Sequence, residues 1–122
     1  MDNRESAEMY LETIYILSEK SDSVRKIDIS RYMGYAKPSV TRGISLLEKR
    51  GLVTVDGEGI IILTKEGKRD AKRIYERHTV LSKMLENLGV DEKTAAEDAC
   101  RIEHYISDTS FKAIKAHLKK YK

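Results

Sequence analysis

The chain has little cysteine and no long apolar run. A single cysteine among 122 residues excludes an internal disulfide. No hydrophobic stretch approaches the roughly 18 residues that a membrane-spanning helix needs. The first residues are acidic and polar, whereas a secretory signal is basic and then apolar. We therefore expect a cytoplasmic protein, in a reducing compartment and without a membrane partner.

The sequence also lacks repeats, low-complexity tracts and flexible linkers. Its hydrophobic fraction of 40% allows one compact core or two small lobes, but not several independent domains. A net charge of +3 is too small to indicate a nucleic-acid partner by itself. The distribution of the charge is therefore more informative than its total.

Charge of each sign gathers in a different half of the chain. Residues 24–50 contain seven basic and two acidic side chains, a balance of +5, and residues 86–104 contain two basic and six acidic ones, a balance of −4. A basic first half can meet phosphate, and an acidic second half can meet cations. Both could instead be ordinary solvated helix faces.

The first half has the pattern of a winged helix–turn–helix. Apolar residues recur at helical spacing over 5–20 and again over 27–33, where Gly34 ends the second segment. A third helix follows, and Pro38 is tolerated in its first turn. Two β-rich segments, 52–56 and 60–63, flank an Asp-Gly-Glu-Gly sequence, which is a strong hairpin signal.

The second half is predicted to be helical throughout. Thr64 can cap a long helix over 65–88 that ends at Gly89, and Asp91 and Ser107 can cap two more helices, the last of which carries Phe111 and Tyr121. The apolar stripe of the long helix consists of Ala71, Ile74, His78, Leu81, Leu85 and Leu88. The fold class is mainly α, with a winged-helix DNA-binding domain over 1–70 and an α-helical domain over 71–122, joined by the long helix.

The third helix supplies the candidate DNA contacts, because the second helix of a helix–turn–helix places its N-terminal side chains in the major groove. Arg42 could bind guanine through two hydrogen bonds, and Lys37 suits a phosphate. The hydroxyls of this segment could contact bases or phosphate, or could serve local backbone bonding. The predicted DNA-binding set is Arg25, Lys26, Lys37, Pro38, Ser39, Thr41 and Arg42.

A thiol, a carboxylate and an imidazole stand at i, i+3 and i+4 near residue 100. On a helix these three share a face and could hold one cation. The first predicted helix repeats the theme with a thioether and a carboxylate at i and i+3. A lone Cys could be an inert small hydrophobe and a lone His a satisfied core residue, but six donor residues from three helices could converge on one or two ions. The predicted metal ligands are Met9, Glu12, His78, Cys100, Glu103 and His104.

Four longer segments, together with these donors, resemble the diphtheria toxin repressor family and its shorter manganese transport regulators. The segments are EMYLETIYIL (8–17), SVTRGISLLEKRGLV (39–53), LTKEGKRDAKRIYERH (63–78) and EDACRIEH (97–104). The resemblance implies a homodimeric, metal-activated transcriptional repressor that binds double-stranded operator DNA. It also implies that the helical domain over 71–122 binds metal and dimerises, and that the protein controls metal homeostasis genes.

The chain departs from both branches of that family. Met9, Cys100, Glu103 and His104 match the primary site of the iron-responsive branch, and His78 matches a ligand of both branches. Glu12 matches a carboxylate of the manganese branch, in which an aspartate stands at position 9 and a glutamate at position 100. The other positions of the ancillary iron-type site fall on Ser82 and Ala96, so we expect that site to be incomplete. We also expect no third, SH3-like domain.

Ligand chemistry favours Fe(II) over Mn(II), because a thioether and a thiolate prefer softer ions. Mn(II) is the alternative cofactor, and Co(II), Ni(II) or Zn(II) could bind in vitro. An enzyme is not expected, since the sequence shows no general base or pocket motif for a small-molecule substrate. The remaining alternative is a winged-helix transcription factor whose helical lobe only dimerises and does not respond to metal.

Overall fold

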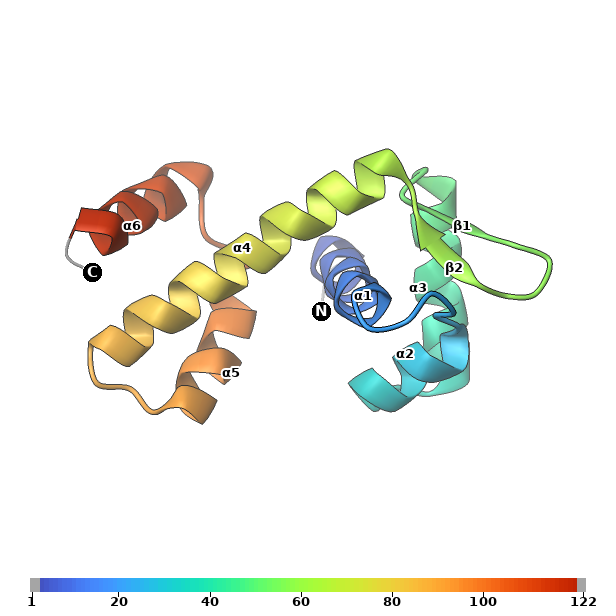
Figure 1. Ribbon diagram of the computed structural model, residues 1–122, viewed down its shortest axis with the longest axis horizontal. Coiled ribbons are helices and arrows are strands. Elements are labelled where there is room, and N and C mark those ends of the chain that lie inside the picture. The colour runs from blue at the N-terminus through green and yellow to red at the C-terminus, as the bar shows by residue number, and fades with distance from the viewer. Residues whose placement is uncertain (1–2, 121–122) are drawn as a thin grey trace. The chain divides into compact units, whose positions relative to one another are not determined.

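The computed structural model describes residues 3–120, with side chains from residue 5 onward. The chain divides into two compact units at residues 72 and 73, so the described residues fall into 3–72 and 73–120. The elements, labelled in Figure 1, are α1 (Asn3–Ser18), α2 (Lys26–Met33), α3 (Lys37–Lys49), β1 (Val53–Val55), β2 (Ile61–Leu63), α4 (Lys65–Asn87), α5 (Glu92–Ile102) and α6 (Asp108–Lys120). None of the helices over 3–120 is long and apolar enough to cross a membrane. The mainly α fold class with a winged helix–turn–helix is confirmed.

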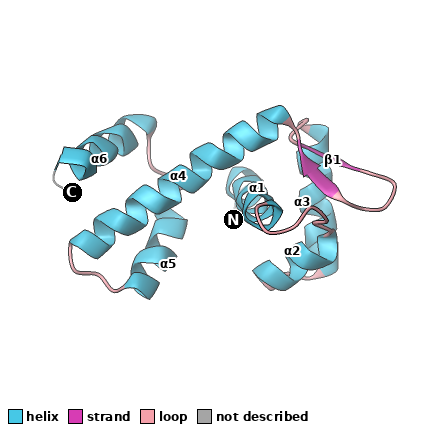
Figure 2. Cartoon of the chain, viewed as in Figure 1, coloured by secondary structure: helices cyan, strands magenta, loops and turns pink. Residues whose placement is uncertain are grey.

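The first unit contains α1, α2, α3, the β-hairpin and the start of α4. Figure 2 distinguishes the helices from the strands by colour. Strands β1 and β2 pair antiparallel, with Val53 opposite Leu63. The side chain of Asp56 organises the turn between them, because its Oδ1 accepts hydrogen bonds from the amides of Glu58 and Ile60 at 2.9 and 3.0 Å. The hairpin predicted from the Asp-Gly-Glu-Gly sequence is therefore present.

The helix–turn–helix is set by local signals at both helix ends. Before α2, the amide of Arg25 donates to the carboxylate of Asp28 at 2.9 Å, which satisfies a group exposed at the helix start. After α2, Gly34 adopts φ 71°, the left-handed conformation that glycine reaches without strain. Pro38 then stands in the first turn of α3, where a missing amide hydrogen removes no helical bond.

The core of the first unit forms where the apolar faces of these elements meet. Each fully buried aliphatic side chain contributes roughly 1.5–3 kcal/mol relative to exposure. The buried aliphatic side chains are Ala7, Leu11, Ile14, Val24, Ile29, Val40, Ile44, Leu47, Val53, Ile61 and Ala71. Because α1, α2 and α3 each supply part of this set, burial fixes the position of α3, the second helix of the helix–turn–helix, within the unit.

The second unit comprises the greater part of α4 together with α5 and α6, and its helix starts follow the predicted caps. The carboxylate of Asp91 accepts from the amide of Thr94 at 3.0 Å, and this bond holds the pKa of Asp91 below its usual range. The Ser107 hydroxyl accepts from the amide of Ser110 at 3.1 Å. Thr64 similarly accepts from the amide of Gly67 at the start of α4.

Several predicted boundaries were wrong by one to two residues. Helix α1 ends at Ser18 rather than residue 20, and each strand has three residues. Strand β1 begins after Leu52 because the amide of that residue donates to the carbonyl of Leu47 and closes the end of α3. Leu88 was predicted to belong to the apolar stripe of the long helix, but it lies beyond the end of α4 and is 75% exposed. Tyr121 lies outside the described residues.

Candidate metal centre and nucleic-acid interface

The C-terminal end of α5 brings together the three donors predicted from their spacing. The thiol of Cys100, a carboxylate oxygen of Glu103 and a ring nitrogen of His104 all lie within 4.8 Å of one another. Glu103 caps the helix with φ −58° and ψ −27°, so the helical path continues through it and the i, i+3, i+4 spacing produces a single face. Sequence spacing alone therefore predicted this cluster.

Two of the three polar side chains of this cluster are almost fully buried, which is unusual for a carboxylate and an imidazole. Glu103 is 1% exposed and His104 is 3% exposed, whereas Cys100 is partly buried. A buried carboxylate is expensive unless charged or hydrogen-bonded groups surround it. His78 does so for one oxygen, with Nδ1 at 3.0 Å from Glu103 Oε2. The other oxygen, Oε1, lies 3.3 Å from His104 Nε2 but has no hydrogen-bond partner among the described residues, so half of this buried carboxylate is left uncompensated.

His78 reaches this carboxylate from α4, 25 residues earlier in the chain. Its side chain is 27% exposed, so it lies at the edge of the cluster rather than in its interior. Thiolate, carboxylate and imidazole donors at one buried point suit a divalent transition-metal ion. Cys100, Glu103 and His104 thus fit a metal by their chemistry and mutual distances, and His78 contacts the carboxylate of Glu103.

Arg77 supports the same segment and was not predicted from the sequence. Its guanidinium donates to the backbone carbonyls of Glu103 and Ile106 at 3.2 and 2.8 Å, and it pairs with the carboxylate of Asp108. It also lies over the Phe111 ring, 5.4 Å from the centroid. The signal that could have found it is helical spacing, because Arg77 falls on the buried stripe of α4, three residues after Ile74.

The positions expected to complete an ancillary site line a groove. Ser82 and Ala96 border a groove of about 640 Å³ in the second unit, which His78 also lines. A hydroxyl and a methyl group are poor ligands for iron or manganese compared with carboxylate and imidazole. Ser82 and Ala96 therefore supply weaker ligands than the cluster at the end of α5, although His78, Glu86 and Glu92 also line this groove.

Met9 and Glu12 lie on α1, in the first unit. Both side chains are partly buried, and their i, i+3 spacing is retained in the helix. Their participation with the donors of the second unit stays a prediction.

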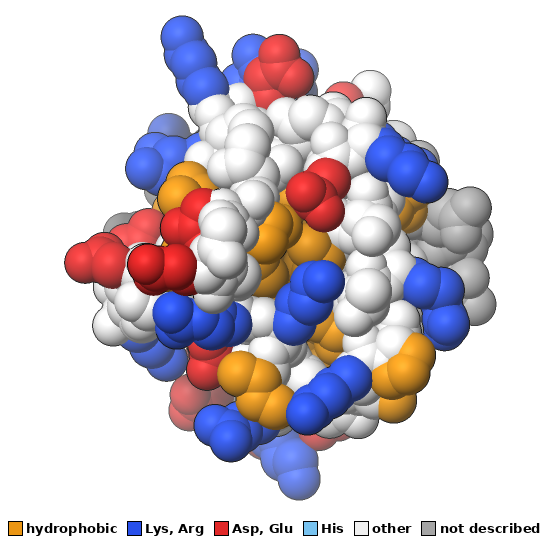
Figure 3. All heavy atoms as spheres, turned by 90° about the vertical axis from the view of Figure 1, so that its right-hand side faces the viewer, with side chains coloured by type: hydrophobic (Ala, Val, Ile, Leu, Met, Phe, Trp, Pro, Cys, Tyr) orange, Lys and Arg blue, Asp and Glu red, His pale blue; other side chains and the backbone are white. Residues whose placement is uncertain are grey.

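The exposed face of α3 is a candidate nucleic-acid interface. Lys37, Pro38, Thr41 and Arg42 are exposed, and Ser39 is partly buried. Figure 3 shows Lys and Arg side chains spread over the right-hand side of Figure 1, with Asp and Glu side chains among them. A surface of mixed charge with exposed basic groups along one helix can place cations near phosphate while leaving the helix free to approach bases.

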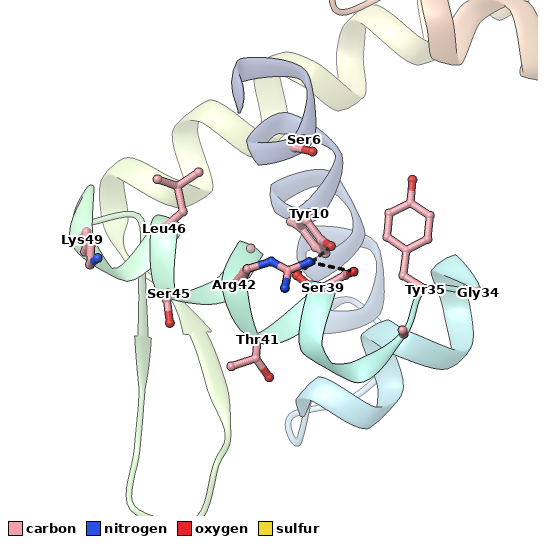
Figure 4. A pocket seen from close by; sticks show the side chains of 12 residues that line it. Ser6, Tyr10, Gly34, Tyr35, Ser39, Thr41, Arg42, Ser45, Leu46 and Lys49 are labelled. Atoms are coloured by element: carbon pink, nitrogen blue, oxygen red, sulfur yellow. Dashed lines mark hydrogen bonds between the residues drawn. The ribbon is translucent and has the colours of Figure 1, made fainter. Parts of the chain in front are cut away.

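A groove of about 860 Å³ runs along this face (Figure 4). It is lined by Arg42, Ser45 and Lys49 of α3 and by Tyr35 of the preceding loop. Ser45 and Lys49 were not among the predicted contacts, although their spacing of three and seven residues from Arg42 places them on the same helical face. Extending the helical periodicity beyond the first turn would have found them.

Arg25 and Lys26 are partly buried at the start of α2. The Nε of Arg25 donates to the Glu58 carbonyl at 3.3 Å, so this side chain contacts the turn of the hairpin. Arg42 Nη2 donates to the hydroxyl of Ser39 at 3.4 Å, a contact between side chains rather than the backbone bonding given as the alternative for that hydroxyl.

Comparison with known proteins places both units in one family. Residues 3–59 match the iron-dependent repressor N-terminal DNA-binding domain, and residues 64–122 match the iron-dependent repressor metal-binding and dimerisation domain. An uncharacterised HTH-type transcriptional regulator of Methanocaldococcus jannaschii is 33% identical over 120 residues, which are 97% of this chain and 96% of that protein.

Two further relatives are named as an MntR regulator and as a manganese-dependent repressor. The HTH-type transcriptional regulator MntR of Bacillus pumilus is 35% identical over 109 residues, 89% of this chain and 76% of that protein. The solved structure of a manganese-dependent transcriptional repressor in complex with manganese is 30% identical, with a TM-score of 0.86 over 93% of this chain. The chain spans 52% of the length of that second protein.

The matches cover both halves of the chain in the order of the family, and they agree with the donor cluster and the winged helix described above. The predicted family is therefore confirmed: the chain belongs to the diphtheria toxin repressor family of metal-dependent transcriptional regulators, which includes the MntR proteins.

Proposed function

We propose that this protein represses transcription by binding operator DNA as a homodimer when it is loaded with Fe(II) or Mn(II), and that it controls genes of metal homeostasis. The observation that carries the proposal is the cluster of Cys100, Glu103 and His104, whose donors lie within 4.8 Å of one another at the end of α5. A divalent cation there would compensate the burial of the Glu103 carboxylate. In this role the metal is an effector of DNA binding and not a reagent.

The proposed ligands are the predicted six. Cys100, Glu103, His104 and His78 supply thiolate, carboxylate and imidazole donors from the second unit. Met9 and Glu12 would add a thioether and a carboxylate from α1, the first helix of the DNA-binding domain. Their inclusion is supported by donor type and by the i, i+3 spacing in α1, and by the resemblance of these positions to family ligands.

The proposed metal is Fe(II), with Mn(II) as the alternative. Cys100 is the main support for iron, because thiolates favour softer ions than Mn(II). The names of the relatives support manganese, since one is called manganese-dependent. The Irving–Williams order places Mn(II) and Fe(II) lowest in affinity, so the metal supply of the cell contributes to the choice.

The proposed coupling links the domains at 1–70 and 71–122. Metal bound by residues of both domains would restrain them, and this restraint would fix the spacing of the two α3 helices in a dimer. Two half-sites on DNA lie one helical turn apart, roughly 34 Å, or a multiple of it. A coupling free energy of about 1–3 kcal/mol would give a 5- to 150-fold change in DNA affinity.

The test compares DNA affinity with and without metal. A duplex is first selected from a random library with protein and Mn(II), and its dissociation constant is then measured by fluorescence anisotropy in chelator, in Mn(II), and anaerobically in Fe(II). We expect binding at least about fivefold tighter with metal. Equal affinity in all three conditions would leave the alternative, a winged-helix factor that does not respond to metal.

Cys100 can be tested separately from the rest of the cluster. Cys100→Ala should weaken Fe(II) binding and reduce the metal response of DNA affinity, and Cys100→Glu should shift the preference toward Mn(II) because a carboxylate suits the harder ion. Glu97→Gln is the matched control, since Glu97 is an exposed residue of the same helix outside the cluster. A Cys100→Ala protein with a full metal response would remove Cys100 from the site.

A further inference from the structure

A glycine stands in the middle of the recognition helix. Gly43 is buried in α3, and glycine in a helix interior is less stable than alanine by roughly 0.5–1 kcal/mol. Its backbone does not require glycine, because its φ is not positive. A reason for glycine must therefore come from what packs against it.

The ring of Tyr10 occupies that space. A Cβ at position 43 would lie 2.4 Å from Tyr10 Cε2 and 2.6 Å from Cδ2, far inside van der Waals contact. Tyr10 is 4% exposed and belongs to α1. The absence of a side chain at Gly43 thus lets α1 approach α3 closely at this point.

The hydroxyl of Tyr10 is also fastened to the recognition helix. It donates to the backbone carbonyl of Ser39 at 3.1 Å, in the first turn of α3. The Tyr35 ring meets the Tyr10 ring edge to face, at 6.1 Å between centroids and 76° between planes. Figure 4 shows Tyr10 beside Arg42 and Ser39 in the groove.

Along the chain, Tyr10 directly follows Met9 and comes two residues before Glu12. Helix α1 therefore carries the two proposed metal ligands Met9 and Glu12. It also carries the Tyr10 ring and hydroxyl, which contact α3. A rigid helix transmits a displacement at one face to its other contacts.

We propose that Tyr10 is a positioning residue, which packs against Gly43 and thereby couples the position of α1 to that of α3. Metal binding at Met9 and Glu12 would in this way set the orientation of Ser39 and Arg42. This inference rests on the proposed function. Tyr10 touches neither metal nor DNA in this role, and it acts through the packing of α1 on α3.

The experiment measures metal affinity and DNA affinity separately for Tyr10→Phe and Gly43→Ala. Mn(II) affinity is measured by competition with a fluorescent chelator, and DNA affinity by anisotropy in chelator and in saturating Mn(II). Tyr75→Phe is the control, because it removes a hydroxyl from a tyrosine of α4 that is 41% exposed. Circular dichroism establishes that each variant is folded.

For Tyr10→Phe we expect Mn(II) affinity within twofold of the parent, DNA affinity in chelator also within twofold, and DNA affinity in Mn(II) lower by about 2- to 10-fold, the range that one hydrogen bond supplies. For Gly43→Ala the added methyl should lower DNA affinity in Mn(II) about tenfold or more, because it pushes α3 away from the ring. If Gly43→Ala does not fold, Tyr10→Phe still decides the matter.

Three results would overturn the inference. Tyr10→Phe could bind DNA in Mn(II) as tightly as the parent, or it could lose the same factor in chelator and in Mn(II), which would mean a purely structural role. In both cases the parent still responds to metal, and the proposed function stands. A parent protein that shows no metal response would overturn the proposed function and this inference together.

Discussion

The substitution Arg77→Met removes the donor of two hydrogen bonds to backbone carbonyls. Methionine retains a flexible apolar stem that can cover Phe111 but has no donor for the carbonyls of Glu103 and Ile106. The segment around Glu103 would then lose two of its contacts with α4, whereas the contact between His78 and Glu103 would remain. The substitution therefore tests how much this one side chain stabilises the second unit.

The magnitude follows from the burial of the acceptors. Leaving a buried acceptor without a partner costs about 1–3 kcal/mol. The bond to Glu103 is buried and that to Ile106 is partly buried, so the two together predict a loss of about 2–4 kcal/mol in the free energy of unfolding. Asp108 adds little, because its side chain is 75% exposed and solvent can replace the guanidinium.

The assay is urea denaturation in chelator, at one protein concentration because a dimer would make stability concentration-dependent. Arg101→Met is the matched control. Its partner is Asp98 at 3.0 Å, but the two side chains are 73% and 45% exposed, so the expected loss is about 0.5 kcal/mol or less. A chelator competition should also show Mn(II) affinity reduced by roughly 10- to 100-fold in Arg77→Met, the usual effect of removing a group that orients metal ligands.

A small effect would refute this reasoning. If the free energy of unfolding of Arg77→Met is within about 1 kcal/mol of that of the parent, the carbonyls of Glu103 and Ile106 bind other partners or water. If stability falls but metal affinity does not, Arg77 stabilises the fold without orienting the ligands.

Three further predictions concern the helix cap and the DNA face. Hydrogen bonding lowers the pKa of Asp91 in the folded state, so its stabilising effect should be present at neutral pH and disappear as the pH falls through that lowered pKa. Urea midpoints measured from pH 7 to pH 2 should show this loss for the parent. Asp91→Asn, which retains an uncharged cap, should lack this contribution. Lys37→Ala should weaken binding to all duplexes about equally and reduce the salt slope by about 1, as measured by anisotropy at several salt concentrations. Arg42→Ala should instead relax sequence selectivity by about 1–3 kcal/mol at one base pair, and a uniform loss on all sequences would contradict base contact.

Most of the fold could be predicted from local signals. Gly34, Thr64 and Asp91 each act within one turn of the residues they cap, and the structure retains all three. The errors arose at the ends of helices, where the closing bonds of the helix end the periodic pattern. Leu88 continues the apolar spacing of α4, but Gly89 adopts a positive φ just beyond it and the leucine is exposed.

The donor cluster was predictable for the same reason. Cys100, Glu103 and His104 are close because a helix brings i, i+3 and i+4 together, and no other part of the chain is needed to place them. The burial of Glu103 could not be predicted in this way, because it depends on which elements pack over the end of α5.

Local patterns in the sequence specify the donor types, their spacing on one helical face and the winged helix–turn–helix, and its longer segments identify the family. Tertiary packing brings His78 to Glu103 across 25 residues, brings Arg77 to the carbonyl of Glu103 across 26, and places Tyr10 against Gly43. The physical reason is range. Propensity, capping and periodicity act over a few residues, whereas these contacts depend on how the apolar faces of separate helices pack, and packing selects polar partners that no local pattern specifies.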